Sequence, residues 1–503
     1  MFRIDQPILV DTEDPEYYAE LLSKTHRPPN WRLLSNETLC SGIPGIQDVD
    51  DPLSQRIRTL LDVVADISLC KRGNVSATMA CIKANKDALE TQIYITFNHK
   101  DDGAARNCLV HLQSIFDILS RVPYRSHGVD SSPKDISSEL EGSLFEICRT
   151  IHNYSFDIFA YRVNKRKHKL SDIRRYIEQD EHQFNSRQRS KLLGFLSHVG
   201  FIIKVVANAQ TTKQLSSNFI CGLVKTYSFW KKNSLLPKEG LADNAVTLLD
   251  HVDAWLADTH GIGFRLRRWA VKIMSFVISA DRLFTLTQSR RLRKFLDGTF
   301  VIKPLPCPAT TPYRCNLSSE NIRVALDAAL HQTKYSTAEW DEERESFTVL
   351  LRDKLEDSEA CRKPTVHAEL VMITALFKGE LQEVLPYIGV SKLSCMMCIH
   401  YIQALNEVTG KRIAVKGSHR KAYPGWSWPS LPSHDREVRR ALLQLNRQQL
   451  WSDFNLHVES RRGSNSSMGY GVPGFETVAT EDDIRAIFSL ELGRPVDALR
   501  LYV

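Results

Sequence analysis

A histidine, a glutamate and two cysteines have the residue types and the spacing of a zinc centre. His367 and Glu369 stand two residues apart, and Cys395 and Cys398 are the only closely spaced pair among 11 cysteines. Imidazole and thiolate are preferred zinc ligands, and three protein ligands leave one tetrahedral position open for water. Bound zinc lowers the pKa of such a water to about 7. Glu369 is then placed to carry protons between this water and a substrate.

The first half of this motif is expected at the start of a buried helix. The Pro-Thr pair at 364–365 favours a helix start, residues 368–377 are mostly apolar, and Gly379 is a plausible end. His367 and Glu369 would then lie in the first turn and point to different sides of one small space. One can bind a metal while the other reaches the metal's water.

The second half is expected at the start of another helix, after a short buried strand. The apolar stretch 384–390 predicts this strand, which would begin only after Pro386. Residues 395–407 then predict a helix with Ser394 as its N-cap. A helix N-terminus favours negative charge, so the thiols of Cys395 and Cys398 are poised to ionise and bind zinc.

The combined pattern resembles that of zinc-dependent nucleobase deaminases, whose signature is H-x-E followed by P-C-x-x-C. The sequence has His-Ala-Glu at 367–369 and Cys-Met-Met-Cys at 395–398, with Ser394 in place of the usual proline. The later segment SHRKAYPGW at 418–426 is similar to the tail of uncharacterised fungal proteins in the cytidine deaminase-like superfamily. Those proteins combine a helical N-terminal region with a nucleic-acid deaminase-like C-terminal domain. The clear resemblance covers about residues 363–429.

This resemblance implies a set of roles that the structure can be compared with. His367, Cys395 and Cys398 would bind zinc, and Glu369 would be the catalytic proton shuttle of a hydrolytic deaminase. The substrate would be a cytosine or adenine in nucleic acid, with a free nucleoside or nucleotide as the alternative. Four further residues are predicted to line the substrate pocket, where an aromatic ring could stack on a base or simply pack the loop: His419, Tyr423, Trp426 and Ser394.

The predicted fold class is α+β. Residues 1–300 are mostly helical in pattern, and we expect them to form a scaffold or a binding region. A proline-rich stretch at 303–319 marks a boundary near residue 300. Residues 301–440 would form a three-layer α/β/α cytidine deaminase-like domain, and residues 441–503 a C-terminal extension with a flexible segment at 461–474. Residues 130–138 are predicted to be a loop.

Composition is that of a soluble globular chain, with 43% hydrophobic and 25% charged residues. The acidic first residues predict no secretory or transit peptide, and scattered cysteines predict no disulfide framework, so an intracellular location, cytoplasmic or nuclear, is expected. The apolar stretch 192–209 is interrupted by polar residues and predicts a buried helix rather than a membrane span.

The positive charge of the chain is unevenly distributed. Residues 161–191 contain ten Lys and Arg against four Asp and Glu, and residues 265–294 contain nine against one. Such clusters fit a nucleic-acid partner, although solvated helix faces give the same pattern. The sequence does not indicate an oligomeric state.

Three other interpretations remain open from the sequence. A structural zinc site could be closed by a fourth ligand, for which His400, Cys361 and His419 are candidates. The chain could instead keep the deaminase fold as a binding protein without activity. Finally, a structural zinc module could be part of a scaffold that binds nucleic acid through its basic segments.

Overall fold

The structure is a computed structural model in which two compact units, Met1–Asp453 and Phe454–Val503, are described separately. It describes residues 8–25, 52–71, 74–84, 89–98, 102–122, 133–165, 167–180, 182–233, 235, 247–289, 292–293, 299–330, 340–355 and 361–466. Of the extension predicted at 441–503, residues 467–503 lie outside this described part. The elements below belong to the first unit, except that the last helix continues into the second.

A five-stranded mixed sheet forms the centre of the first unit, in the order β4-β3-β2-β7-β8. Its strands are β2 (Ser76–Ala84), β3 (Leu89–Phe97), β4 (Thr299–Pro304), β7 (Tyr387–Val390) and β8 (Ala414–Val415). β2 is antiparallel to both β3 and β7, whereas β3–β4 and β7–β8 are parallel pairs. The sheet therefore takes strands from both sides of residue 300, and the boundary expected there does not divide it.

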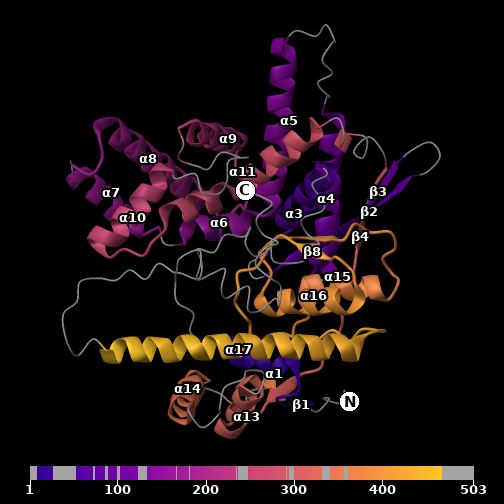
Figure 1. Ribbon diagram of the computed structural model, residues 1–503. Helices are drawn as coiled ribbons and strands as arrows, with labels where there is room; N and C mark the ends of the chain where they lie inside the picture. The colour runs from indigo at the N-terminus through magenta and orange to yellow at the C-terminus, as the bar shows by residue number, and fades with distance from the viewer. Residues whose placement is uncertain are drawn as a thin grey trace, which may run out of the picture. The chain divides into compact units, whose positions relative to one another are not determined.

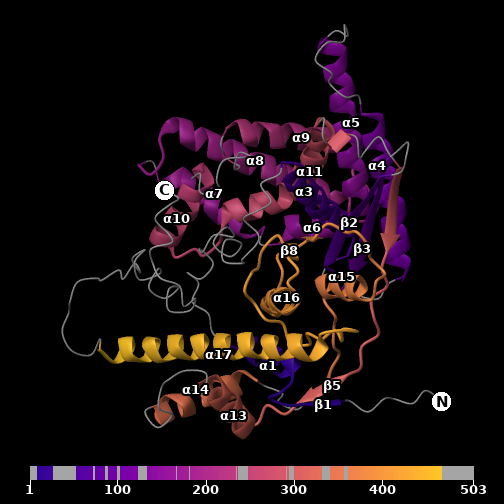
Figure 2. The same ribbon diagram turned by 45° about the vertical axis from the view of Figure 1, so that its right-hand side comes forward.

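Helices cover both faces of this sheet and create three layers (Figures 1 and 2). On one face α3 (Pro52–Ile67) contacts β2 and β7, and α4 (Asp102–Arg121) contacts β4. On the other face α15 (Ala368–Phe377) contacts β2, β3 and β7, with α16 (Met396–Thr409) beside it. The fold is α+β with a mostly helical N-terminal region, as predicted.

The helical region lies in the chain between β3 and β4. Its remaining helices are α5 (Pro133–Tyr154), α6 (Phe156–Asn164), α7 (Lys169–Gln179), α8 (Ser186–Asn208), α9 (Ser217–Lys232), α10 (Leu248–His260) and α11 (Leu266–Thr287). Of these, α11 contacts α3 directly and also packs against α5, α6, α9 and α10. The apolar core is continuous from α3 into this region. Because α11 packs against α3, and α5 and α11 both contact α4, the helical region is attached to the sheet through α3 and α4.

A second, three-stranded sheet contains β1 (Ile8–Val10), β5 (Tyr313–Cys315) and β6 (Cys361–Arg362), in the order β1-β5-β6. The short helix α1 (Pro15–Leu22) follows β1 and is almost entirely buried. The two helices α13 (Ser319–Leu330) and α14 (Asp341–Lys354) pack together nearby. Two residues just before α1 form ion pairs with α17 (Asp435–Ser466): Asp14 pairs with Arg439, and Glu13 pairs with Arg447.

Three local predictions differ from the structure. Residues 130–138 were expected to form a loop, but α5 begins at Pro133, a residue that suits the first turn of a helix. The run 461–474 was expected to be flexible, but α17 continues to Ser466, and residues 467–474 lie outside the described part. Ser394 was expected to cap the second motif helix, but Cys395 occupies the N-cap position.

Within the described residues, α8 is the one helix that could span a membrane by length and composition, a test that core helices of soluble proteins also pass. A third of its most apolar window is buried. Leu192, Phe195 and Val199 are among its buried residues, and the helix packs against α6, α7 and α9. The prediction of a helix at this position is therefore confirmed.

Gly389 in β7 makes the close approach of α3 to the sheet possible. A Cβ atom at this position would lie 2.5 Å from the backbone carbon of Leu61, a distance that real Cβ contacts do not show. We predict that Gly389→Ala lowers the free energy of unfolding by about 1–3 kcal/mol, because α3 must shift. Gly200→Ala in α8, where nothing lies within 4 Å, should instead stabilise the protein by about 0.5–1 kcal/mol. Urea unfolding of both variants measures these changes; equal effects would contradict this account of Gly389.

Candidate metal centre

The side chains of His367, Cys395 and Cys398 meet in one cluster. The Nδ1 atom of His367 lies 3.3 Å from the Sγ atom of each cysteine, and the three donor atoms all lie within 4.8 Å of one another. Two ligands at Zn–N and Zn–S bond lengths and the tetrahedral angle would stand about 3.6 Å apart. The donor types and spacings therefore fit a metal ion such as zinc, for which three protein ligands would leave one of four tetrahedral positions over.

Both halves of the cluster sit at helix N-termini. His367 is the N-cap residue of α15, and Cys395 is the N-cap residue of α16. The Sγ atom of Cys395 accepts a hydrogen bond of 3.3 Å from the backbone N–H of Cys398, as a serine side chain does in an ordinary cap. Both sulfurs thus lie where free N–H groups and the helix dipole favour negative charge.

The two thiols and the imidazole influence each other's ionisation. Burial opposes thiolate formation at Cys395, but a hydrogen bond from Cys398 and the charge of His367 bring its pKa well below the usual value. Burial and the neighbouring thiolate raise the pKa of Cys398. Although burial disfavours its charged form, His367 has a pKa raised to about 8 by the attraction of Cys395. Without a metal one sulfur of the pair ionises readily, whereas a metal cation would favour both thiolates.

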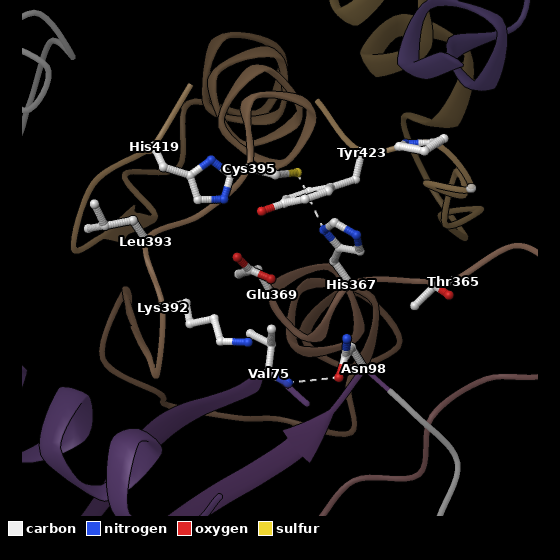
Figure 3. A pocket seen from close by; sticks show the side chains of 12 residues that line it. Val75, Asn98, Thr365, His367, Glu369, Lys392, Leu393, Cys395, His419 and Tyr423 are labelled. Atoms are coloured by element: carbon white, nitrogen blue, oxygen red, sulfur yellow. Dashed lines mark hydrogen bonds between the residues drawn. The ribbon is translucent and has the colours of Figure 1, made fainter. Parts of the chain in front are cut away.

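Glu369 lies beside this cluster, in the first turn of α15 and almost completely buried. Burial raises the pKa of its carboxyl group, and the Oε2 atom has no hydrogen-bond partner among the described residues. A buried polar atom without a protein partner is rare, and it fits a carboxylate that meets water or a ligand in the adjoining cavity. Figure 3 shows the carboxylate facing the cavity between His367 and Lys392.

A cavity of about 320 Å³ opens onto the cluster. Its walls come from both sides of residue 300 and contain Val75, Asn98, Thr365, His367, Glu369, Lys392, Leu393, Cys395, His419, Tyr423, Pro424 and Gly425 (Figure 3). The ring of Tyr423 is half exposed and lies 6.2 Å from the ring of His367 and 5.3 Å from that of His419. The cavity therefore combines an aromatic wall with a carboxylate and two of the three metal donors, His367 and Cys395.

Two of the predicted pocket residues do not line this cavity. The side chain of Trp426 is fully buried, and the side chain of Ser394 is 1% exposed. Trp426 follows the wall residues directly, and its backbone pairs with Thr365. Trp426 therefore packs the loop onto the domain, which is the second of the two interpretations that the sequence left open. His419 and Tyr423 do stand in the wall.

The three candidates for a fourth ligand lie outside the donor cluster. His400 pairs through Nδ1 with Asn446 Oδ1 at 2.8 Å, and Cys361 is exposed on β6. His419 accepts a hydrogen bond from the backbone N–H of Lys421 through Nδ1 and lines the cavity. Among the described residues, the donor atoms that come together are those of His367 and the two cysteines.

The part of the wall that comes from β2 and β3 was not predicted from the sequence. Val75 precedes β2 and Asn98 follows β3. The backbone N–H of Asn98 donates to the carbonyl of Val75, and the N–H of Val75 donates to the side chain of Asn98. The Oδ1 atom of Asn98 accepts from Val75 N at 2.8 Å, so its Nδ2 points toward the cavity (Figure 3). The alternating β-branched and aromatic residues at 91–97 were the available signal for this strand.

Comparisons with known proteins agree with this geometry. Residues 366–430 match the model of a deaminase family described as OTT_1508_deam-like deaminase. The match contains all three metal donors, Glu369 and the wall residues His419 and Tyr423. No curated protein and no solved structure matched the chain. The chain thus contains a deaminase-like domain with a His/Cys/Cys group that could hold a metal ion.

We predict that the purified protein contains one zinc ion per chain and that Cys398→Ser abolishes this binding. The loss of one of three protein ligands should weaken zinc affinity by at least about 100-fold, because thiolate is the strongest donor type in the set. Metal analysis by mass spectrometry after dialysis measures the content. Cys361→Ser, at an exposed cysteine, is the matched control and should keep its zinc. Full zinc retention in Cys398→Ser would exclude this site.

Proposed function

We propose that this chain is a zinc-dependent hydrolytic deaminase that replaces the exocyclic amine of a cytosine or adenine with oxygen. The favoured substrate is a base in nucleic acid. One observation carries the proposal: the metal donors His367 and Cys395 line the same cavity as Glu369. A purely structural zinc site usually has four protein ligands and no open position. A buried carboxylate beside an open position is what hydrolysis needs.

The chemistry requires one nucleophile and two proton transfers. Zinc held by His367, Cys395 and Cys398 would supply a water with a pKa of about 7. Glu369 accepts a proton from the attacking water and delivers it to the ring nitrogen of the base. It then takes the second proton from the new hydroxyl group and delivers it to the exocyclic amine, the carbon–nitrogen bond breaks, and ammonia leaves as the carbonyl forms. The raised pKa of Glu369 suits this exchange, since the carboxyl group must both accept and donate the proton.

The cavity walls support a nucleobase as the substrate. Tyr423 offers an aromatic face for stacking, and Asn98 offers amide hydrogens that can reach polar atoms of a base. A cavity of about 320 Å³ is at the small end for ligand sites and suits one base with its sugar. A base within a polymer would therefore have to leave its stack to enter.

One positive charge in the cavity wall, that of Lys392, supports an anionic substrate. Lys392 stands in the wall and donates to the backbone oxygen of Asn74 at 3.1 Å while remaining exposed. Part of the basic excess in the helical region is neutralised by ion pairs, such as Arg174 with Glu178 and Arg267 with Asp250. Lys392 is therefore a stronger argument for phosphate recognition than the overall charge. An intracellular location remains part of this proposal.

We expect Glu369→Gln to lower the rate of deamination by about 100- to 10,000-fold, because the variant cannot transfer protons. Zinc content should be unchanged, since Glu369 is not among the metal donors. Ammonia release is to be measured with single-stranded DNA, RNA, cytidine and adenosine.

Glu380→Gln, an exposed position just beyond the same helix, is the matched control and should keep full activity. A zinc-loaded wild-type protein that is inactive on all four substrates would count against a deaminase. It would favour a protein that keeps the fold for binding.

We expect Lys392→Gln to weaken activity on single-stranded nucleic acid more than on a free nucleoside. Loss of one phosphate contact should lower the slope of log affinity against log salt by about one. Binding of a fluorescent oligonucleotide at several salt concentrations tests this, with Lys204→Gln on the exposed face of α8 as the control. An unchanged slope together with equal losses on both substrates would show that Lys392 does not contact phosphate.

A further inference from the structure

A buried carboxylate on the N-terminal helix holds the wall of the cavity. Glu20 lies in α1, and its side chain is 0% exposed. Its Oε1 atom accepts hydrogen bonds from the backbone N–H of Gly425 at 2.8 Å and from the hydroxyl of Tyr313 at 3.1 Å. Its Oε2 atom accepts from Nε of Arg362 at 3.2 Å. Glu20 thus joins three segments that are far apart in the sequence.

The neighbouring acidic residue of α1 contributes to the same contact. Glu16 lies one helical turn before Glu20, and its Oε1 atom accepts from the backbone N–H of Trp428 at 2.7 Å. Two carboxylates on one face of α1 therefore hold two backbone amides of the loop after the metal motif. Bonds from a neutral N–H to a charged acceptor are stronger than those between neutral groups, especially where water is excluded.

The loop held in this way forms one side of the cavity. Tyr423, Pro424 and Gly425 are wall residues, and Gly425 has a positive φ of 77°. Its carbonyl accepts from Thr365 N at 2.7 Å, and Thr365 lies two residues before the metal donor His367. The backbone of Gly425 is therefore fixed between Glu20 on one side and the approach to the metal centre on the other. A shift of this residue would move the ring of Tyr423.

We propose that Glu20 is a positioning residue that fixes the 423–425 wall in the shape that receives the substrate base. The inference rests on the proposed function for its kinetic consequence, but the restraint itself can be measured without activity. Glu20 touches neither the metal donors nor the cavity, and it is not within the matched deaminase region. The N-terminal helix α1 thus helps to shape a site whose metal donors begin almost 350 residues further along the chain.

The main test is Glu20→Gln. The amide has the same shape, but it carries no charge. Both carboxylate oxygens of Glu20 accept hydrogen bonds, so in either orientation the NH₂ group of the glutamine would face a donor, Arg362 or the N–H of Gly425. We expect KM to rise about tenfold, which is the effect expected from the loss of one charge-assisted hydrogen bond. The value of kcat should change far less. Zinc content should stay at the wild-type value. Hydrogen exchange in a peptide covering 423–428 should become at least about tenfold faster, while peptides from α15 and α16 keep their rates.

Two variants make the test decisive. Glu13→Gln removes the same charge from the approach to α1, where Glu13 is 70% exposed and pairs with Arg447, and should leave KM and exchange unchanged. Tyr313→Phe removes one of the donors to Glu20 and should give a smaller change in the same direction, even if Glu20→Gln fails to fold. A merely structural role would lower the melting temperature and the active fraction but leave KM unchanged.

The outcomes separate this inference from the proposed function. Normal exchange at 423–428 and a normal KM in both Glu20→Gln and Tyr313→Phe would overturn the role of Glu20, while the effect of Glu369→Gln would still stand. If the wild-type protein proves inactive on every nucleobase substrate, the proposed function fails. In that case faster exchange at 423–428 supports the restraint by Glu20, and unchanged exchange overturns it.

Discussion

The convergence of two helix N-termini on one small volume is the constraint on which the site depends. His367 and Cys395 begin α15 and α16, and their side chains share that volume with Cys398 and Glu369. Three of these four groups can carry negative charge, and the interior would make them repel one another strongly. The helix dipoles offset part of this repulsion, and a bound cation would offset the rest. Binding of a metal here would therefore also stabilise this region.

The central sheet determines where those helices begin. β7 ends at Val390, only five residues before Cys395, so the position of this strand places the second cysteine-bearing helix. β7 in turn lies against α3, where Gly389 leaves room for the backbone of Leu61. The other half of the cavity depends on β2 and β3, whose ends bring in Val75 and Asn98. The precision of the site therefore depends on strands from both sides of the helical region in the chain.

Local signals allowed the elements that carry the metal donors to be predicted, but not their surroundings. The apolar stretch before Gly379, the proline before β7 and the cap at 394–395 gave α15, β7 and α16 to within one or two residues. Pairing of β2 with β7 joins residues more than 300 positions apart, and no periodicity encodes that register. The same is true of the hydrogen bond from Gly425 to Glu20. The burial of Trp426 also depends on such distant neighbours. The motif alone does not show this burial, and for that reason Trp426 was predicted to be a pocket residue.

Helix α3 carries two carboxylates that link the helical region to the strand before the metal motif. Asp62 accepts hydrogen bonds from Val390 N at 3.1 Å and from the Tyr387 hydroxyl at 2.9 Å, both in β7. One turn further on, Asp66 accepts from Ser279 of α11 at 3.0 Å and lies 3.8 Å from a guanidinium nitrogen of Arg162 of α6. Because the two acids sit on one rigid helix, a shift of α6 and α11 against the sheet would strain both sets of bonds. The helical region therefore helps to hold β7, and through it the start of α16, in place.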